Sequence, residues 1–240
     1  MKDSLDILRS DDYVEHHGIK GQKWGVRRYQ NYDGTRIKKS NSISSAKRIA
    51  NSITNKVKSD SKPPTGNQNC QLCTWCAEAQ FRGMKDSLPR PIYSPRDPAL
   101  SIQGETIVKN PEKITSKNYS DLESKINLVS GDARFYTHVN WKNSAGGHEF
   151  LIIKDGNKKY IMDPQVGHTE PMTSKSEYLS DINYNNSYIT RLDNKEFNTE
   201  LFKKVNDNKN VMQFDEKLDI PYMYKEGMIS KEEYDEFKKR

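Results

Sequence analysis

Long apolar runs are what this 240-residue sequence most clearly lacks. Hydrophobic residues make up 33% of the chain, and no apolar run approaches the roughly 18 residues of a membrane span. The first six residues, Met1–Asp6, include acidic side chains and no apolar stretch, so we expect no secretory signal peptide. The composition leaves room for one modest core, and we expect one domain of ordinary size with extensions and no contact with a membrane.

Cysteine is also scarce, and all three cysteines lie close together at Cys70, Cys73 and Cys76. An odd number of closely spaced thiols without a signal peptide indicates reduced cysteines in an intracellular protein. Structural zinc sites usually draw two ligands from each of two knuckles, and the sequence has no second cysteine pair. Three thiolates with a remote histidine keep a zinc module open as an alternative. Otherwise we expect no metal and no cofactor.

The net charge of +6 is unevenly distributed along the chain. Met1–Lys62 contains fourteen Lys and Arg against seven Asp and Glu, a balance of +7, so the remaining residues carry about −1. This asymmetry argues against a nucleic-acid-binding core and favours a basic N-terminal arm. We expect the arm to be disordered and to attract DNA non-specifically, in a salt-dependent way.

One part of the arm, Asp12–Thr35, holds two aromatic pairs among glycines and basic residues. His16 and His17 are adjacent and point apart, which disfavours a zinc site there. Along HHGIKGQKWGVRRYQNYDGT the segment resembles one near the N-terminus of structural and virion-associated proteins of tailed bacteriophages of Gram-positive hosts. The resemblance implies phage origin, phage head or other virion proteins as partners, and a location in the host bacterial cytoplasm or packaged in the virion.

The body of the chain is predicted to begin with a helix and to continue as strands. Cys70–Arg82 contains no Gly or Pro and lies between Asn69, a good N-cap, and Gly83, a usual C-terminal stop. After a proline-rich loop at 88–98, a capping box at Ser120–Glu123 opens a short helix. Alternating patterns and turn residues predict strands at Ala133–Trp141, His148–Lys154, Lys158–Asp163 and Ser187–Leu192, with a hairpin turn at Asp155–Asn157.

A leading helix followed by an antiparallel sheet indicates an α+β fold. We divide the chain into a basic arm and linker at 1–62, a catalytic domain at 63–195 and a C-terminal extension at 196–240. The linker proper is the Ser/Asn/Lys-rich stretch at 36–62, which can form a helix around Ser44–Val57. The extension ends in a short helix that follows a capping box at Ser230.

The cysteine-bearing helix is a candidate mount for a nucleophile. A thiol in the first turn of a helix faces unpaired N–H groups and the positive end of the helix dipole, which favour thiolate over thiol. Cys70 occupies the first helical position and is preferred. Cys73 lies one turn later on the same face and stays open as the alternative. Cys76 lies deeper and is expected to be packed.

A cysteine nucleophile needs a base, and the base needs an orienting partner. His138 lies in mid-strand and is expected to be structural, and His168 follows Gly167 in a loop. His148 opens the hairpin after two glycines, and Asp163 ends its returning strand. Folding the hairpin at 155–157 pairs residue 148 with roughly 163–164, about 5 Å apart at Cβ. Asp163 is therefore predicted to hold the tautomer of His148.

NCQLCTWCAEAQFRG followed by GGHEFLIIKDGNKKYIMDPQVG resembles the papain-fold toxin (Tox-PL) family, the predicted protein-glutamine deamidases of bacterial polymorphic toxins and phage-encoded proteins. The resemblance covers residues 66–192. It implies a papain-like cysteine hydrolase core, with the catalytic helix packed on an antiparallel sheet and a Cys–His–Asp triad. His148 would be the base, Asp163 its orienter, and Gln165 would help to position the substrate or the histidine.

The expected enzyme is a cysteine-dependent hydrolase that deamidates a glutamine of a protein substrate through a thioester. Because the same groups cleave peptide bonds or transfer acyl groups to amines, a cysteine peptidase or transglutaminase is the alternative. A non-catalytic capsid-associated protein, in which the arm does the work, is a further alternative.

Overall fold

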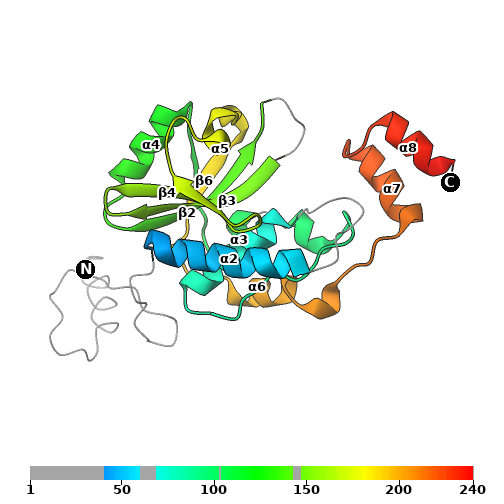
Figure 1. The fold of residues 1–240 in the computed structure, drawn as a ribbon, viewed down its shortest axis with the longest axis horizontal. Helices are drawn as coiled ribbons and strands as arrows, with labels where there is room; N and C mark the ends of the chain where they lie inside the picture. The colour runs from blue at the N-terminus through cyan, green and yellow to red at the C-terminus, as the bar shows by residue number, and fades with distance from the viewer. Residues whose placement is uncertain (1–40, 60–68, 103, 143–146, 240) are drawn as a thin grey trace, which may run out of the picture. The chain divides into compact units, whose positions relative to one another are not determined.

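The computed structural model describes residues 41–59, 69–102, 104–142 and 147–239. Residues 1–40 of the predicted basic arm and linker therefore lie outside the described residues. Within them the chain has the expected α+β architecture, built on an antiparallel six-stranded sheet with the strand order β1-β6-β2-β3-β4-β5 (Figure 1). The strands are β1 Lys113–Thr115, β2 Ala133–Asn140, β3 Gly147–Asp155, β4 Lys158–Asp163, β5 His168–Pro171 and β6 Tyr188–Arg191.

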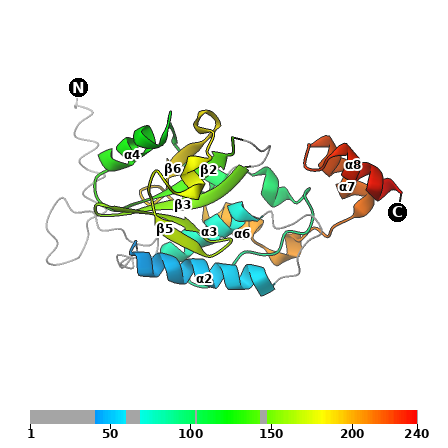
Figure 2. The same ribbon diagram turned by 45° about the horizontal axis from the view of Figure 1, so that its top comes forward.

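Helices cover both faces of the sheet. The helix α3 (Cys70–Phe81) lies against one face together with α2 (Ile43–Ser59) and α6 (Thr199–Val205), and α4 (Tyr119–Leu128) and α5 (Glu177–Ser180) lie against the other (Figures 1 and 2). The sequence of the central strand β3 is continuously apolar because both of its faces are buried. Leu151 and Ile153 belong to the core beneath α2 and α3, whereas Phe150 and Ile152 belong to the core beneath α4 and α5.

The strand predictions are confirmed to within one or two residues, and so is the turn that joins β3 to β4. Gly156 has a φ of 60°, a left-handed conformation that glycine adopts without steric cost. The predicted cap of α4 is wrong. The helix begins at Tyr119, and the side chain of Asn118 accepts the hydrogen bond from the backbone N–H of Asp121.

The predicted linker at 36–62 is corrected by the structure, because it contains α2, which belongs to the core. Ala46, Ile49, Ala50, Ile53 and Val57 recur at helical spacing and are buried against the same residues as α3. The exposed positions between them carry the Ser, Asn and Lys that made the segment look like a linker.

The C-terminal part of the chain also contributes to this core through Phe197 and α6, whose Phe202 and Val205 are buried. Beyond them, α7 (Glu216–Lys225) is held by Asp219, whose Oδ1 accepts hydrogen bonds from Ser94 and Arg96. The capping box at Ser230 is confirmed and starts α8 (Lys231–Lys238), which packs on α7.

Short 3-10 turns complete the connections between these elements. They are η1 Pro98–Ser101, η2 Gly104–Ile107, η3 Tyr184–Asn186 and η4 Asn208–Asn210. Among the described helices, none combines the length and the apolar character that crossing a membrane would require.

Candidate active site

The three cysteines occupy different environments along α3. Cys70 is the first residue of the helix and is partly exposed, whereas Cys73 and Cys76 are both 0% exposed and belong to the core under α2. Burial raises the pKa of Cys76 well above its ordinary value, so this thiol stays protonated. Of the two candidate nucleophiles, Cys70 is therefore the one that a substrate can reach.

His148 and Asp163 meet as expected, although through a different strand register. His148 Nε2 lies 2.6 Å from Asp163 Oδ2. The β3–β4 ladder ends at the pair Leu151–Met162, and one further pair would place Phe150, not His148, opposite Asp163. His148 pairs instead with Val139 of β2, and Asp163 pairs with His168 of β5. The two side chains thus meet where β3 and β4 are no longer paired.

The protonation of His148 depends on its burial and on two neighbours, Asp163 and Cys70. Burial favours the neutral imidazole, but hydrogen bonds to Asp163 and Cys70, together with their negative charges, raise its pKa from 6.5 to about 10. Because Nε2 faces Asp163, Nδ1 is the ring nitrogen left for the Cys70 thiol. At neutral pH the site therefore holds an imidazolium between a carboxylate and the sulfur of Cys70.

Asp163 is enclosed by hydrogen-bond donors. It is 1% exposed, and burial alone would raise its pKa. The imidazolium, the hydroxyl of Tyr178 and the backbone N–H of Gln165 outweigh burial and lower that pKa. Tyr178 donates to Oδ2 over 2.8 Å and Gln165 N to Oδ1 over 2.9 Å. Asp163 is thus held as a carboxylate with both oxygens occupied.

Tyr178 is a site residue that the sequence reasoning missed. It comes from α5, a single helical turn that carried no motif, and its ring approaches those of both His148 and His168. Trp141 stacks on His148 with ring centroids 6.3 Å apart. The imidazole is thereby packed between aromatic rings that fix its plane. His168, expected in a loop, begins β5.

Asn69 does not act as the predicted N-cap. Its φ of −100° and ψ of 23° lie outside the usual capping conformation, and its side chain accepts no hydrogen bond from the first turn of α3. Its Oδ1 accepts instead from Gln165 Nε2 over 3.2 Å. Gln165 therefore touches both Asp163, through its backbone, and the residue that precedes Cys70, through its side chain.

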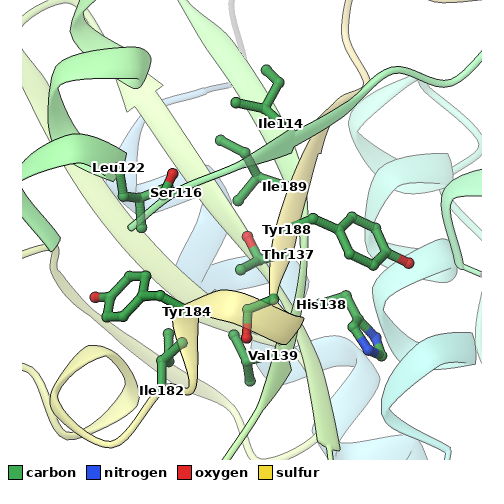
Figure 3. A pocket seen from close by; sticks show the side chains of 11 residues that line it. Ile114, Ser116, Leu122, Thr137, His138, Val139, Ile182, Tyr184, Tyr188 and Ile189 are labelled. Atoms are coloured by element: carbon green, nitrogen blue, oxygen red, sulfur yellow. The ribbon is translucent and has the colours of Figure 1, made fainter. Parts of the chain in front are cut away.

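A second histidine–carboxylate pair lies on the neighbouring strands, where Nδ1 of His138 is 3.3 Å from Oε1 of Glu149. The ring of His138 stacks on that of Tyr188. Both residues help to line a small apolar hollow, and in Figure 3 their rings lie on the side away from Ile182 and Tyr184, which line it too. The hollow includes none of Cys70, His148 and Asp163.

In the described part of the chain, the search for three or more His, Cys, Asp or Glu side chains placed to hold a metal ion finds no such group. Cys70 contacts His148, whereas Cys73 and Cys76 are both buried in the core under α2.

Comparison with known proteins gives a family match in the N-terminal segment. Residues 6–31 match a model described as Family of unknown function (DUF7211). The match overlaps the phage-like segment, lies outside the described residues and does not reach the candidate site. Neither the curated proteins nor the solved structures gave a match to this chain.

Proposed function

We propose that this protein is a phage-associated, papain-like cysteine amidohydrolase that deamidates a glutamine side chain of a target protein. One observation carries the proposal. The partly exposed Cys70 at a helix start, the imidazole of His148 and the buried carboxylate of Asp163 form one hydrogen-bonded line. Nucleophile, proton carrier and orienting carboxylate are the parts that covalent acyl transfer requires.

The charges of the site suggest how the reaction begins. With His148 protonated and Asp163 ionised, Cys70 reacts as a thiolate, because an imidazolium cannot accept the proton of a thiol. The sulfur attacks the carboxamide carbon, and the C–S bond forms. The first-turn N–H groups of α3 stabilise the negative oxygen.

Collapse of the tetrahedral intermediate breaks the C–N bond. His148 gives its proton to the departing nitrogen, which leaves as ammonia, and becomes neutral. The neutral imidazole then takes a proton from water, whose oxygen attacks the thioester carbon. Release of the Cys70 thiolate and of a glutamate side chain restores the starting ion pair.

The preference for a glutamine side chain rests on the resemblance of the Cys, His and Asp-Pro-Gln motifs to predicted glutamine deamidases. The same line of residues acting on a backbone amide would make a peptidase. The phage association rests on the sequence of the N-terminal segment and is likewise a proposal.

The test is iodoacetamide labelling at acid to neutral pH, mapped to individual cysteines, in the wild type and in His148→Ala. We expect fast modification of Cys70 alone in the wild type and slow modification in the variant, because the ion pair is lost. Incubation with a glutamine-rich protein should release ammonia and leave new glutamates without chain cleavage.

Slow and equal labelling of all three cysteines would contradict the proposed function. New peptide termini in the protein substrate would identify a peptidase instead. Cysteine protection that disappears when a chelator is added would identify a zinc site.

A further inference from the structure

The position before the nucleophile breaks a local rule of helix formation. Asparagine is among the best N-cap residues because its side-chain oxygen accepts a first-turn N–H. Asn69 stands at this place in α3 and does not do so. By contrast, Asn118 caps α4 and Asn198 caps α6 with ordinary side-chain hydrogen bonds. The side chain of Asn69 therefore leaves the first turn of α3 uncapped, and only its backbone oxygen accepts a hydrogen bond from the helix, from Cys73 N.

The carboxamide of Asn69 is held in place by its oxygen. Oδ1 accepts the hydrogen bond of Gln165 Nε2, and the backbone N–H of Gln165 is bound to Oδ1 of Asp163. The same carboxylate that orients His148 thus anchors Asn69 through one residue. The carboxamide is tied to the histidine side of Cys70 and not to the apolar core around Cys73.

The nitrogen of the carboxamide has no such anchor. Asn69 is 3% exposed, yet its Nδ2 donates to no acceptor among the described residues. It is also not among the unpartnered atoms that the fold encloses completely. A buried donor without an acceptor is costly unless a bound molecule or water completes it. The carboxamide is therefore held through its oxygen, in the residue directly before the nucleophile, while its nitrogen has no acceptor among the described residues.

We infer that the Asn69 side-chain amide is a catalytic hydrogen-bond donor to the oxyanion, acting together with the N–H groups at the start of α3. Gln165 is its positioning residue. The inference rests on the proposed function, which it deepens, since an oxyanion forms only if Cys70 attacks a carbonyl carbon. The ligand class is therefore a carboxamide, ester or peptide carbonyl.

Two reactions of the same thiol separate this role from all others. Alkylation by iodoacetamide displaces iodide and forms no oxyanion, whereas acylation by p-nitrophenyl acetate passes through one. Removing one oxyanion donor typically costs about 100- to 1,000-fold in rate. We expect Asn69→Ala to lose acylation on this scale while alkylation of Cys70 stays at the wild-type rate.

Two further variants separate the loss of the N–H donor from misfolding. Asn69→Asp keeps an oxygen for Gln165 Nε2 but has no N–H to donate, and it should lose acylation like Asn69→Ala. Asn118→Ala is the matched control, because it removes an asparagine that caps a helix in the usual way. It should lower the melting temperature and leave both reactions of Cys70 unchanged.

Each result decides between the roles. Acylation at the wild-type rate in Asn69→Ala would overturn the inference. An equal loss of alkylation and acylation would also overturn it, because Asn69 would then act by placing Cys70 or His148. If wild-type alkylation does not depend on His148, the proposed function itself fails, whatever Asn69 does.

Discussion

The polar groups at the two ends of helix α3 differ in how completely they are hydrogen-bonded. At the C-terminal end, Glu78 is 0% exposed and its two oxygens accept hydrogen bonds from Arg134 and Arg82. Arg82 donates further to the backbone oxygens of Leu192 and Lys195. Burial alone would raise the pKa of Glu78, but the two guanidinium groups outweigh it and lower that pKa.

At the N-terminal end the polar groups are left partly open. The cap of the first turn is missing, the nitrogen of Asn69 has no acceptor among the described residues, and Cys70 is partly exposed. The Glu and the Arg of the motif therefore have a structural explanation, since they tie α3 to β2 and to the chain after β6. The Asn and the Cys lie at the end of the helix to which we assign the proposed chemistry. A helix can be anchored at one end so that the other end stays reactive.

The largest change in activity is expected from a substitution of Asp163, whose carboxylate contacts His148 beside the N-terminal end of α3. Asp163→Asn removes the charge that helps to raise the pKa of His148, so the pKa should fall from about 10 towards 6.5. The alkaline limb of hydrolysis then moves to lower pH, and turnover falls by up to about 10⁴-fold, as when a triad carboxylate becomes an amide. The pH dependence of kcat/KM, with NMR titration of His148, measures both.

Stability should respond to the same ion pair with a defined sign. A raised histidine pKa stabilises the folded state fully below about pH 6.5, and the contribution is lost as the pH rises through about 10. The free energy of unfolding of the wild type should therefore decline across this interval more than that of Asp163→Asn. Parallel curves for the two proteins would show that Asp163 does not control His148.

The next largest effect is a loss of stability, expected at the C-terminal end of α3. Glu78→Ala leaves two arginines without their buried carboxylate and should lower the free energy of unfolding by about 3–5 kcal/mol. The rate at which the remaining folded molecules are alkylated at Cys70 should not change. Chemical denaturation gives the first quantity and labelling the second.

Cys70→Ala is the matched change at the other end of the helix. It should abolish labelling at position 70 and all hydrolysis, with a far smaller effect on the free energy of unfolding. If Glu78→Ala slowed alkylation of the folded molecules as Asp163→Asn does, the two ends would not be independent, and the comparison would fail.

Local signals in the sequence account for what could be predicted. The turn at Gly156, the strands on either side of it and the helix that begins at Cys70 depend on neighbouring residues, and they are found close to their expected places. The meeting of His148 with Asp163 followed from the hairpin, although the register did not. The ladder between β3 and β4 ends at Leu151 and Met162, although Asp163 is still paired with His168 of β5 on its other edge.

What escaped prediction depends on residues far apart in the chain. Asparagine is a residue type that favours the N-cap position, but the Oδ1 atom of Asn69 accepts a hydrogen bond from Gln165 and caps no helix. Gln165 is distant in sequence, so this contact could not be predicted. Tyr178 has no motif, and its role depends on where α5 places its hydroxyl. The apolar residues of α2, such as Ala46 and Ile49, recur at helical spacing in the sequence. Their burial depends on packing against distant residues of the core, which the local sequence does not identify.

The smallest expected effect concerns a hydrogen bond from α2 to the residue that follows Asp163. Thr54 of α2 donates its hydroxyl to the backbone oxygen of Pro164, directly after Asp163, over 2.9 Å. Gly167 approaches the same threonine so closely that a Cβ there would lie 2.9 Å from its hydroxyl oxygen. Thr54→Val leaves the oxygen of Pro164 without this buried donor, and we expect a loss of about 1–3 kcal/mol in the free energy of unfolding.

Thr54→Ser keeps the hydroxyl and serves as the control, with a smaller loss from the missing methyl group alone. Because Asp163 is also held by Tyr178 and by the backbone of Gln165, alkylation of Cys70 should stay within a few-fold of the wild type in both variants. A large fall in the alkylation rate of Thr54→Val, absent in Thr54→Ser, would show that α2 orients the carboxylate as well as packing behind it. The reactivity of Cys70 would then depend on α2, a helix whose composition is that of a linker.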